Sequence, residues 1–364
     1  MKILKRVLCL TLSALLLFSL GCLKSSEKPA MTYKNTAFPE SSYSYWLSTY
    51  KYNFLYNFNS GSDDEDFWDS KVSDNQTYED YINESILNDI KCRTVALRLF
   101  DEYGLQLTED EIAKIDGDIA DKIEYYGSRE EINTKLAKMN LNIDLLRDVY
   151  IKNAEYDKVN DYLFGDNGIN KPTEEELKEY YNDNFVCVKF ITIYSGVMLN
   201  QDEFGNYEYD EDGKIKYTEL TEDEKKLKSE LIDTVMTSLE AGANIDECIK
   251  EFSDIDYSDS PNGFLISEND VKKYGSDIIK TAFSLETGKC AKVSDDSMTY
   301  IVYKCELPEY SALSAQNKEE CELQTYCTGK KYKEFFAEYI SDVVVNEDVI
   351  SKYSIRTATK NAYF

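Results

Sequence analysis

The sequence predicts an α+β protein, in which an all-α region is followed by a domain that mixes helices with a small antiparallel sheet. Helix-start signals and apolar residues at helical spacing occupy residues 41–165. Alternating β-branched and aromatic residues, typical of strands, follow at 185–194 and 298–307. Another amphipathic helix is predicted within 332–350. The 364 residues suffice for two or three domains.

The chain begins with a segment typical of export. A basic start precedes an apolar run over residues 7–20, which is too short for a good membrane span. "LFSLGC" resembles a bacterial lipoprotein box, and this resemblance implies that Cys22 becomes the lipidated first residue of the mature chain. An uncleaved anchor and a plain signal peptide are the alternatives. We expect a signal at 1–21 and a polar tether at 22–40.

Residues 41–171 are expected to form an N-terminal helical domain. In "SSYSYWLSTYKYNFLYNFN" the apolar and aromatic residues recur at helical spacing, which is more typical of a core than of a ligand platform. Capping boxes, in which a hydroxyl and a carboxylate three residues apart satisfy free amides of the first turn, open four predicted helices of the whole chain. They begin at Thr108, Ser128, Thr173 and Thr221.

Residues 172–308 are expected to form the α+β domain, and 309–364 a C-terminal helix that packs on the N-terminal domain. The predicted order in the α+β domain is helix, strand, two helices, short strand, helix and a closing hairpin. An acidic insert after the first strand carries a hairpin signal at Asp212-Gly213. The insert also fits part of an EF-hand pattern, but "GNYEY" is typical of a strand rather than of the required helix. We favour a hairpin, and the sequence leaves open whether 201–220 binds calcium.

The charge and the residue counts exclude several classes of function. A net charge of −28 argues against nucleic acid, whose phosphates the chain would repel, and against binding an anionic membrane through surface charge. The absence of histidine excludes a Ser-His-Asp triad and the zinc sites that need histidine. The sequence contains no Gly-rich phosphate loop. It therefore predicts no metal and no cofactor.

The nine cysteines follow no metal-binding pattern. Cys9 and Cys22 belong to the export segment, and the remaining cysteines are interpreted as buried free thiols. A disulfide between Cys321 and Cys327, which are six residues apart, is the alternative that their spacing suggests.

The order of elements resembles the parvulin-type peptidyl-prolyl isomerases, and in particular the exported foldases of the PrsA and SurA kind. "PTEEELKEYYNDN" is similar to the family's lead-in helix, and "VKFITI" lies where the family has A-x-H-I-L-I. "IIKTAFSLETGKCAKV" and "MTYIVYKCEL" resemble its last helix and closing strands, and "SREEINTKLAKMNLNIDLLRDVY" its chaperone helices. The resemblance covers most of residues 79–350, and the lipoprotein start fits the Gram-positive PrsA type.

The family's active site has two histidines and a Cys or Asp beside an apolar pocket for proline. By resemblance, Phe190 occupies the first histidine position and Tyr300 the second. Ile255 occupies the Cys/Asp position, with Asp254 and Asp256 on either side of it. The polar floor of the site is therefore replaced at three positions.

The remaining site residues are also carried over by resemblance. Ser297 matches a nearby serine of the family, Ile278 matches the pocket phenylalanine, and Tyr274 lies near the pocket methionine. The candidate catalytic residues are thus Tyr300, Asp256 and Ser297, and the candidate substrate-binding residues are Phe190, Ile278, Tyr274, Phe283 and Leu265.

The resemblance implies a foldase or chaperone, lipid-anchored at the outer face of the cell membrane, that binds unfolded or nascent secreted proteins. Because the histidines are replaced, we expect weak or no prolyl isomerase activity. An active isomerase that uses Asp256 and Tyr300 is one alternative, and a surface scaffold or adhesion lipoprotein is another. The expected partners are unfolded secreted proteins and the membrane, through the lipid on Cys22. A homodimer is left open.

Overall fold

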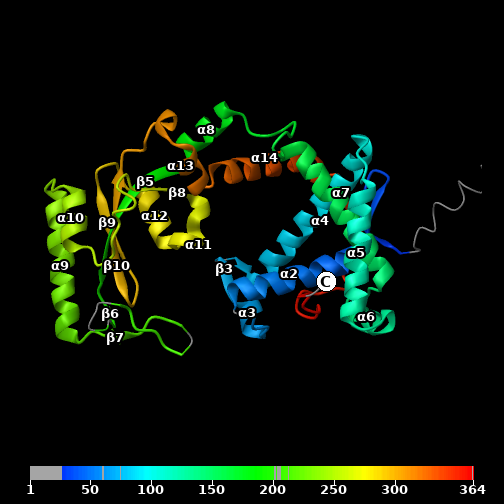
Figure 1. The fold of residues 1–364 in the computed structure, drawn as a ribbon, viewed down its shortest axis with the longest axis horizontal. Helices are drawn as coiled ribbons and strands as arrows, with labels where there is room; N and C mark the ends of the chain where they lie inside the picture. Colours follow the sequence, from blue (N-terminus) through cyan, green and yellow to red (C-terminus); the bar gives the residue numbers. More distant parts are fainter. Residues whose placement is uncertain are drawn as a thin grey trace, which may run out of the picture. The chain divides into compact units, whose positions relative to one another are not determined.

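The computed structural model divides the chain into two compact units (Figure 1). Unit 1 comprises Met1–Lys171 and Lys331–Phe364, and unit 2 comprises Pro172–Lys330. Helices combined with small antiparallel sheets confirm the predicted α+β class. The signal and Cys22 lie outside the described residues, which are 27–59, 61–73, 75–200, 202, 206–211, 213–362 and 364.

Unit 1 is mainly helical, and its long helices share apolar cores. The aromatic segment forms a helix whose Leu47 and Leu55 are buried, which confirms its interpretation as core. The capping box at Thr108 is formed, since its amide donates to the Glu111 carboxylate at 2.6 Å. The helices are α2 (Glu40–Phe58), α3 (Glu65–Asp69), α4 (Tyr78–Glu102), α5 (Glu109–Tyr125), α6 (Arg129–Leu136), η1 (Ala137–Met139), α7 (Ile143–Phe164), α15 (Glu347–Ile350) and the second half of α14 (Leu323–Ile340).

The predicted tether is wrong for residues 29–39, which form an antiparallel hairpin of β1 (Pro29–Tyr33) and β2 (Thr36–Pro39). Met31 and Phe38 of this hairpin are buried in the core of unit 1. A third strand, β11 (Val344–Val345), pairs with β1 from the far end of the chain. The hairpin was not predictable locally, because its apolar residues are buried by partners distant in sequence. Unit 1 also contains a short antiparallel hairpin of β3 (Lys71–Ser73) and β4 (Gln76–Thr77), so this region is not all-α as the sequence predicted.

Unit 2 is built around a four-stranded antiparallel sheet with the strand order β8-β5-β10-β9 (Figure 1). The predicted first strand is β5 (Phe185–Tyr194), whose residues 187–194 pair with the whole of β10 (Met298–Cys305). The predicted closing hairpin is formed by β9 (Cys290–Ser294) and β10. The short β8 (Phe264–Ser267) pairs only with the first part of β5.

Alternation along β5 sends its side chains into two different cores. Val188 and Phe190 face a cluster formed with α12 (Ser276–Ser284) and, through its partly buried Tyr274, with α11 (Val271–Tyr274). Ile191 and Ile193 face a cluster formed with α9 (Glu222–Glu240) and α10 (Ile245–Phe252). Helices therefore cover both faces of the sheet, which explains why β5 is apolar on both sides.

The boundary between the units differs from the prediction. Leu177 and Tyr181 of α8 (Glu174–Asn184) pack against Leu323 at the start of α14. Residues 309–330, which include η3 (Tyr310–Ala312) and α13 (Ala315–Glu320), therefore belong to unit 2 and not to the N-terminal domain. The boundary falls inside the continuous helix α14, so no break in the helical pattern marks it.

The acidic insert after β5 forms a hairpin, as predicted. Strand β6 (Val197–Leu199) pairs with β7 (Tyr217–Glu219), and Tyr209 bridges Ile215. Asp212 lies outside the described residues. In the part of the chain that the structure describes, no three His, Cys, Asp or Glu side chains gather as a metal site would require.

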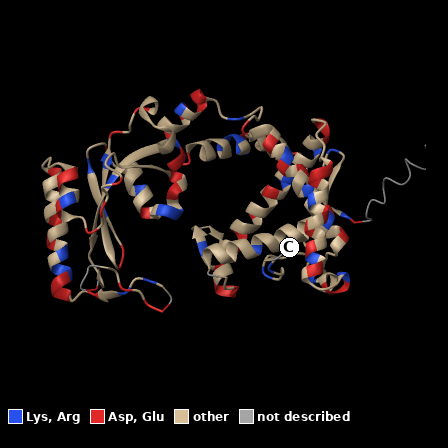
Figure 2. Cartoon of the chain, in the orientation of Figure 1, with Lys and Arg blue, Asp and Glu red and all other residues tan. Residues whose placement is uncertain are grey.

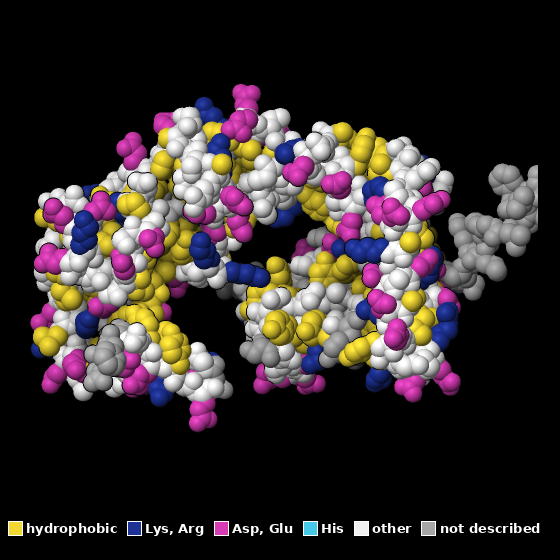
Figure 3. Space-filling model, in the orientation of Figure 1, with side chains coloured by type: hydrophobic (Ala, Val, Ile, Leu, Met, Phe, Trp, Pro, Cys, Tyr) yellow, Lys and Arg dark blue, Asp and Glu magenta, His cyan; other side chains and the backbone are white. Residues whose placement is uncertain are grey.

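Both acidic and apolar side chains reach the surface. Figure 2 shows acidic residues on helices of both units, in line with the net charge of −28. Figure 3 shows hydrophobic side chains at the surface over the strands of unit 2. Among the described residues, no helix combines the length and the apolar character needed to cross a membrane.

Candidate functional site

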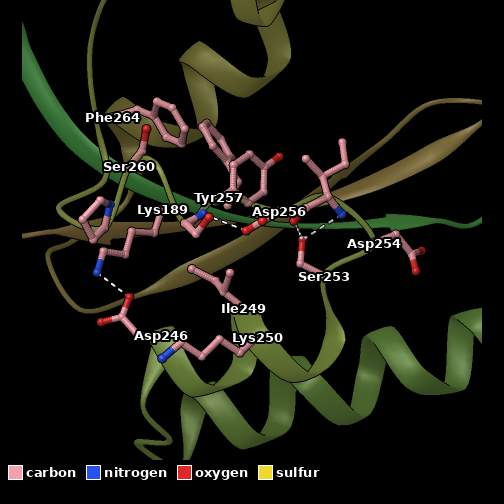
Figure 4. Close-up of a pocket in the computed structure, with 14 residues that line it drawn as sticks. Lys189, Asp246, Ile249, Lys250, Ser253, Asp254, Asp256, Tyr257, Ser260 and Phe264 are labelled. Carbon is pink, nitrogen blue, oxygen red and sulfur yellow. Dashed lines mark hydrogen bonds and ion pairs between the residues drawn. The ribbon is translucent and has the colours of Figure 1, made fainter. Parts of the chain in front are cut away.

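A cavity of about 740 Å³ lies at the edge of the sheet in unit 2 (Figure 4). Its walls come from β5, from α10 and from the loop that leads from α10 to β8. This loop crosses beside β5 at the point where β8 no longer pairs with it. The cavity is large enough for one or two side chains of a bound polypeptide.

Aromatic rings form the apolar part of the cavity. Phe190 lies with its ring centroid 5.5 Å from that of Phe264 and 6.3 Å from that of Tyr257, and these two rings meet edge to face at 5.7 Å. Tyr274 stacks on Phe190 from α11 at 5.9 Å. Ring contacts at these distances hold the side chains in place. The cavity therefore has a preformed aromatic wall.

The buried polar groups next to this wall are hydroxyls. The Tyr257 hydroxyl lies 2.6 Å from that of Thr192, whose side chain is fully buried. Burial raises the pKa of Tyr257, so its phenol stays neutral at physiological pH. The chain contains no histidine, so no imidazole is present to act on a bound peptide bond.

The charged residues of the cavity are largely paired. Lys189 forms an ion pair with Asp246 of α10 at 2.5 Å (Figure 4). Asp254 pairs with Lys228 at 3.2 Å and accepts a hydrogen bond from the Tyr194 amide at 2.8 Å. Asp254 therefore holds the crossing loop against the end of β5, and its carboxylate is committed to the fold.

One residue of the β5 edge is left without a backbone partner inside the cavity. Pairing with β8 ends at Val188. Farther along, the Thr192 amide donates to the Ser253 hydroxyl at 3.2 Å, and the Thr192 carbonyl accepts from the amide after Ser253 at 2.7 Å. Backbone groups two residues apart face the same edge, so those of Phe190 point there too. No described residue of the loop 253–263 bonds to them.

Three predicted site residues line the cavity, namely Phe190, Ile255 and Asp256. Asp256 accepts a hydrogen bond from the Ser258 amide at 2.8 Å, which holds its carboxylate in a local turn. Four more belong to the hydrophobic cluster around Phe190 without lining the cavity: Tyr274, Ile278, Phe283 and Tyr300. Tyr300 lies opposite Thr192 on β10, and burial raises its pKa.

Two predicted site residues lie elsewhere. Leu265 is opposite Cys187, so it points away from the face of Phe190 and packs with the α8 cluster. Ser297 lies in the turn between β9 and β10, where its carbonyl accepts from the Gly196 amide at 2.8 Å. Its role there is to close the end of the sheet.

Sequence reasoning missed Tyr257 and Phe264, which form much of the aromatic wall. Phe264 is opposite Val188 and therefore on the face of Phe190, so strand alternation was a usable signal once the pairing was known. Tyr257 comes from an irregular loop whose course depends on the sheet edge, and no local pattern points to it. The charged rim from α10, Asp246 and Lys250, was also missed.

No family model and no curated protein matches the sequence. Among solved structures, the foldase protein PrsA of Streptococcus pneumoniae is 17% identical over 75% of this chain and 90% of its own, with a TM-score of 0.25. PrsA of Bacillus subtilis is 17% identical over 80% and 94%, with a TM-score of 0.22. The peptidylprolyl isomerase PrsA of Bacillus cereus is 15% identical over 79% and 92%, with a TM-score of 0.28.

Proposed function

We propose that this chain is an extracytoplasmic chaperone of the foldase kind, which holds extended segments of unfolded secreted proteins and has little or no prolyl isomerase activity. The observation that carries the proposal is the cavity of unit 2. It combines an aromatic wall with one unpaired residue of strand edge, Phe190, and it lacks an imidazole. Such a site suits binding of an extended backbone more than catalysis on it.

The proposed mode of binding uses the backbone of Phe190. An extended segment that lies along the β5 edge exchanges two hydrogen bonds with the amide and carbonyl of Phe190, as an added strand does. Alternate side chains of that segment point into the cavity, where Tyr257, Phe264 and Ile255 offer apolar contacts. Backbone bonds do not depend on sequence, so the site accepts many unfolded chains. The net charge of −28 favours neutral or basic segments.

The binding role of the cavity is tested by Ile255→Asp. Ile255 is a half-buried wall residue. A carboxylate in its place, between two other aspartates, removes apolar contact and would lose its hydration when an apolar side chain packs against it. We expect the Kd for a permanently unfolded model protein, reduced and alkylated, to rise about tenfold or more. Fluorescence anisotropy of the labelled model protein measures it.

The matched control is Val271→Asp, a β-branched residue of unit 2 that is 43% exposed and does not line the cavity. We expect its Kd to match that of the unchanged protein. If both variants weakened binding of the unfolded protein equally, or if Ile255→Asp did not weaken it, the cavity would not be the binding site. A protein that neither binds unfolded chains nor slows their aggregation supports the scaffold alternative.

The absence of efficient isomerase activity is tested separately. The barrier to prolyl isomerisation is about 18–20 kcal/mol, and a catalyst lowers it by weakening amide resonance. With Phe190 and Tyr300 in the histidine positions, we expect no acceleration for an Xaa-Pro peptide in exchange NMR, which needs no coupling protease. Acceleration that Asp256→Ala or Tyr300→Phe abolishes would establish the rearranged isomerase instead.

The proposed location rests on the export segment. A signal at 1–21 and a diacylated Cys22 would hold the protein at the outer face of the membrane, where secreted chains emerge unfolded. Two acyl chains suffice for stable anchoring.

A further inference from the structure

Cys187 and Cys305 lie directly opposite each other on the two central strands of the unit 2 sheet. Directly opposite residues of an antiparallel pair have Cβ atoms about 4.5–5.5 Å apart and point to the same face. A disulfide requires Cα atoms about 4.4–6.8 Å apart, which is the spacing of such a pair. The structure holds both side chains as free thiols.

The two thiols differ in exposure and acidity. Cys187 is 1% exposed and lies 3.3 Å from the Asn262 carbonyl, whereas Cys305 is half-buried at the end of β10. The interaction between the two thiols lowers the pKa of Cys305 and raises that of Cys187, and the ammonium of Lys189 favours the thiolate at Cys305. Cys305 is therefore the thiol that a small oxidant meets first, and Cys187 is the resolving thiol beneath it.

We propose that Cys187 and Cys305 are a disulfide-forming pair, which a low-molecular-weight disulfide oxidises once the protein is exported. The Cys305 thiolate attacks the small disulfide, forms a mixed disulfide and releases one small thiolate. Cys187 then gives up its proton and attacks the Cys305 sulfur, which releases the second small thiolate. Two protein thiols lose two electrons, one small disulfide gains them, and each thiol proton ends on a released small thiol.

The disulfide would enclose the candidate site. Residues 188–304 lie between the two cysteines, and they include β5 beyond Cys187, the crossing loop and all residues that line the cavity. Closing a loop of this length restricts the unfolded chain strongly. Oxidation is thus expected to raise the unfolding temperature of unit 2 by roughly 10 °C. This inference is independent of the proposed function.

The test is a peptide map of the full chain under non-reducing conditions. The protein is purified reduced, exposed to oxidised glutathione while folded, alkylated and digested with trypsin. Cleavage places Cys187 in peptide 179–189 and Cys305 in peptide 305–318, each with a single cysteine. We expect a linked 179–189/305–318 species as the main disulfide product. A stable glutathione adduct on Cys305, or a dominant Cys321–Cys327 link, would overturn the proposal.

Matched serine variants separate a specific pair from general oxidation. Cys305→Ser should abolish both the linked species and the rise in unfolding temperature. Cys290→Ser is the control, because Cys290 is also half-buried on a strand of this sheet but lies opposite Tyr303 rather than a cysteine. It should leave both results unchanged. If Cys305→Ser does not fold, the peptide map of the unchanged protein still tests the proposal, because that experiment requires no variant.

Discussion

Asp63→Ala is expected to lower the free energy of unfolding of unit 1 by about 3 kcal/mol, because it leaves a buried ammonium without its counter-ion. Lys51 is 1% exposed, and its ammonium lies 2.8 Å from the Asp63 carboxylate and 2.6 Å from the Arg356 carbonyl. The Trp68 indole donates to the same carboxylate at 2.9 Å. Removing one side chain thus leaves a charge and an indole N–H unpaired together.

Chemical denaturation followed by tryptophan fluorescence measures this loss. The chain has two tryptophans, Trp46 and Trp68, and both lie in unit 1, so the signal reports that unit alone. Asp66→Asn changes an exposed carboxylate in the first turn of α3; it is the control and should change stability by at most about 0.5 kcal/mol. Adding Lys51→Met to Asp63→Ala should recover part of the stability. A double variant as unstable as the single one would show that the buried charge is not the cause.

Gly196→Ala is expected to destabilise unit 2 by roughly 2–3 kcal/mol, because the chain has no room for a side chain there. A Cβ at this position would lie 1.8 Å from the Asp296 carbonyl oxygen. The Gly196 amide also donates to the Ser297 carbonyl at 2.8 Å, and its carbonyl accepts from the Leu220 amide at 3.0 Å. Moving the turn away to relieve the clash would break these bonds and open the end of the sheet.

Hydrogen exchange measured by mass spectrometry can locate this effect, since unit 2 has no tryptophan. The slow amides of β5 and β10 should exchange about 30-fold faster or more, whereas those of unit 1 should not change. Gly117→Ala provides the opposite case. Gly117 lies inside α5 with no atom within 4 Å of its Cβ position, so alanine should stabilise unit 1 by about 0.5–1 kcal/mol. If the hydrogen exchange rates of the Gly196→Ala variant were unchanged, the turn would have accommodated the alanine without loss of stability, and the prediction would be wrong.

The candidate site was predictable only where it depends on strand alternation or on resemblance. Phe190, Ile255 and Asp256, which were chosen by resemblance, all line the cavity. Leu265, also chosen by resemblance, points to the opposite face of the sheet, since neighbouring residues of a strand alternate between faces. Its neighbour Phe264 is the residue that lines the cavity.

The sequence alone determined the local structure and the class of chemistry. Capping boxes at Thr108, Thr173 and Thr221 start helices where predicted, because the groups that satisfy one another lie three residues apart. The β-branched and aromatic content of residues 185–194 predicted β5 as a strand. The absence of histidine excludes imidazole catalysis by this chain, whatever its fold. Each of these conclusions depends on neighbours in the chain or on composition.

Only the tertiary structure decided which distant segments meet. It paired β1 with β11, assigned residues 309–330 to unit 2, left the edge of Phe190 open and placed Cys187 against Cys305. The last pairing differs from the Cys321–Cys327 pair that the spacing suggested. Sheet partners and cavity walls are selected by burial summed over the whole fold, and that sum has no local signature in the sequence.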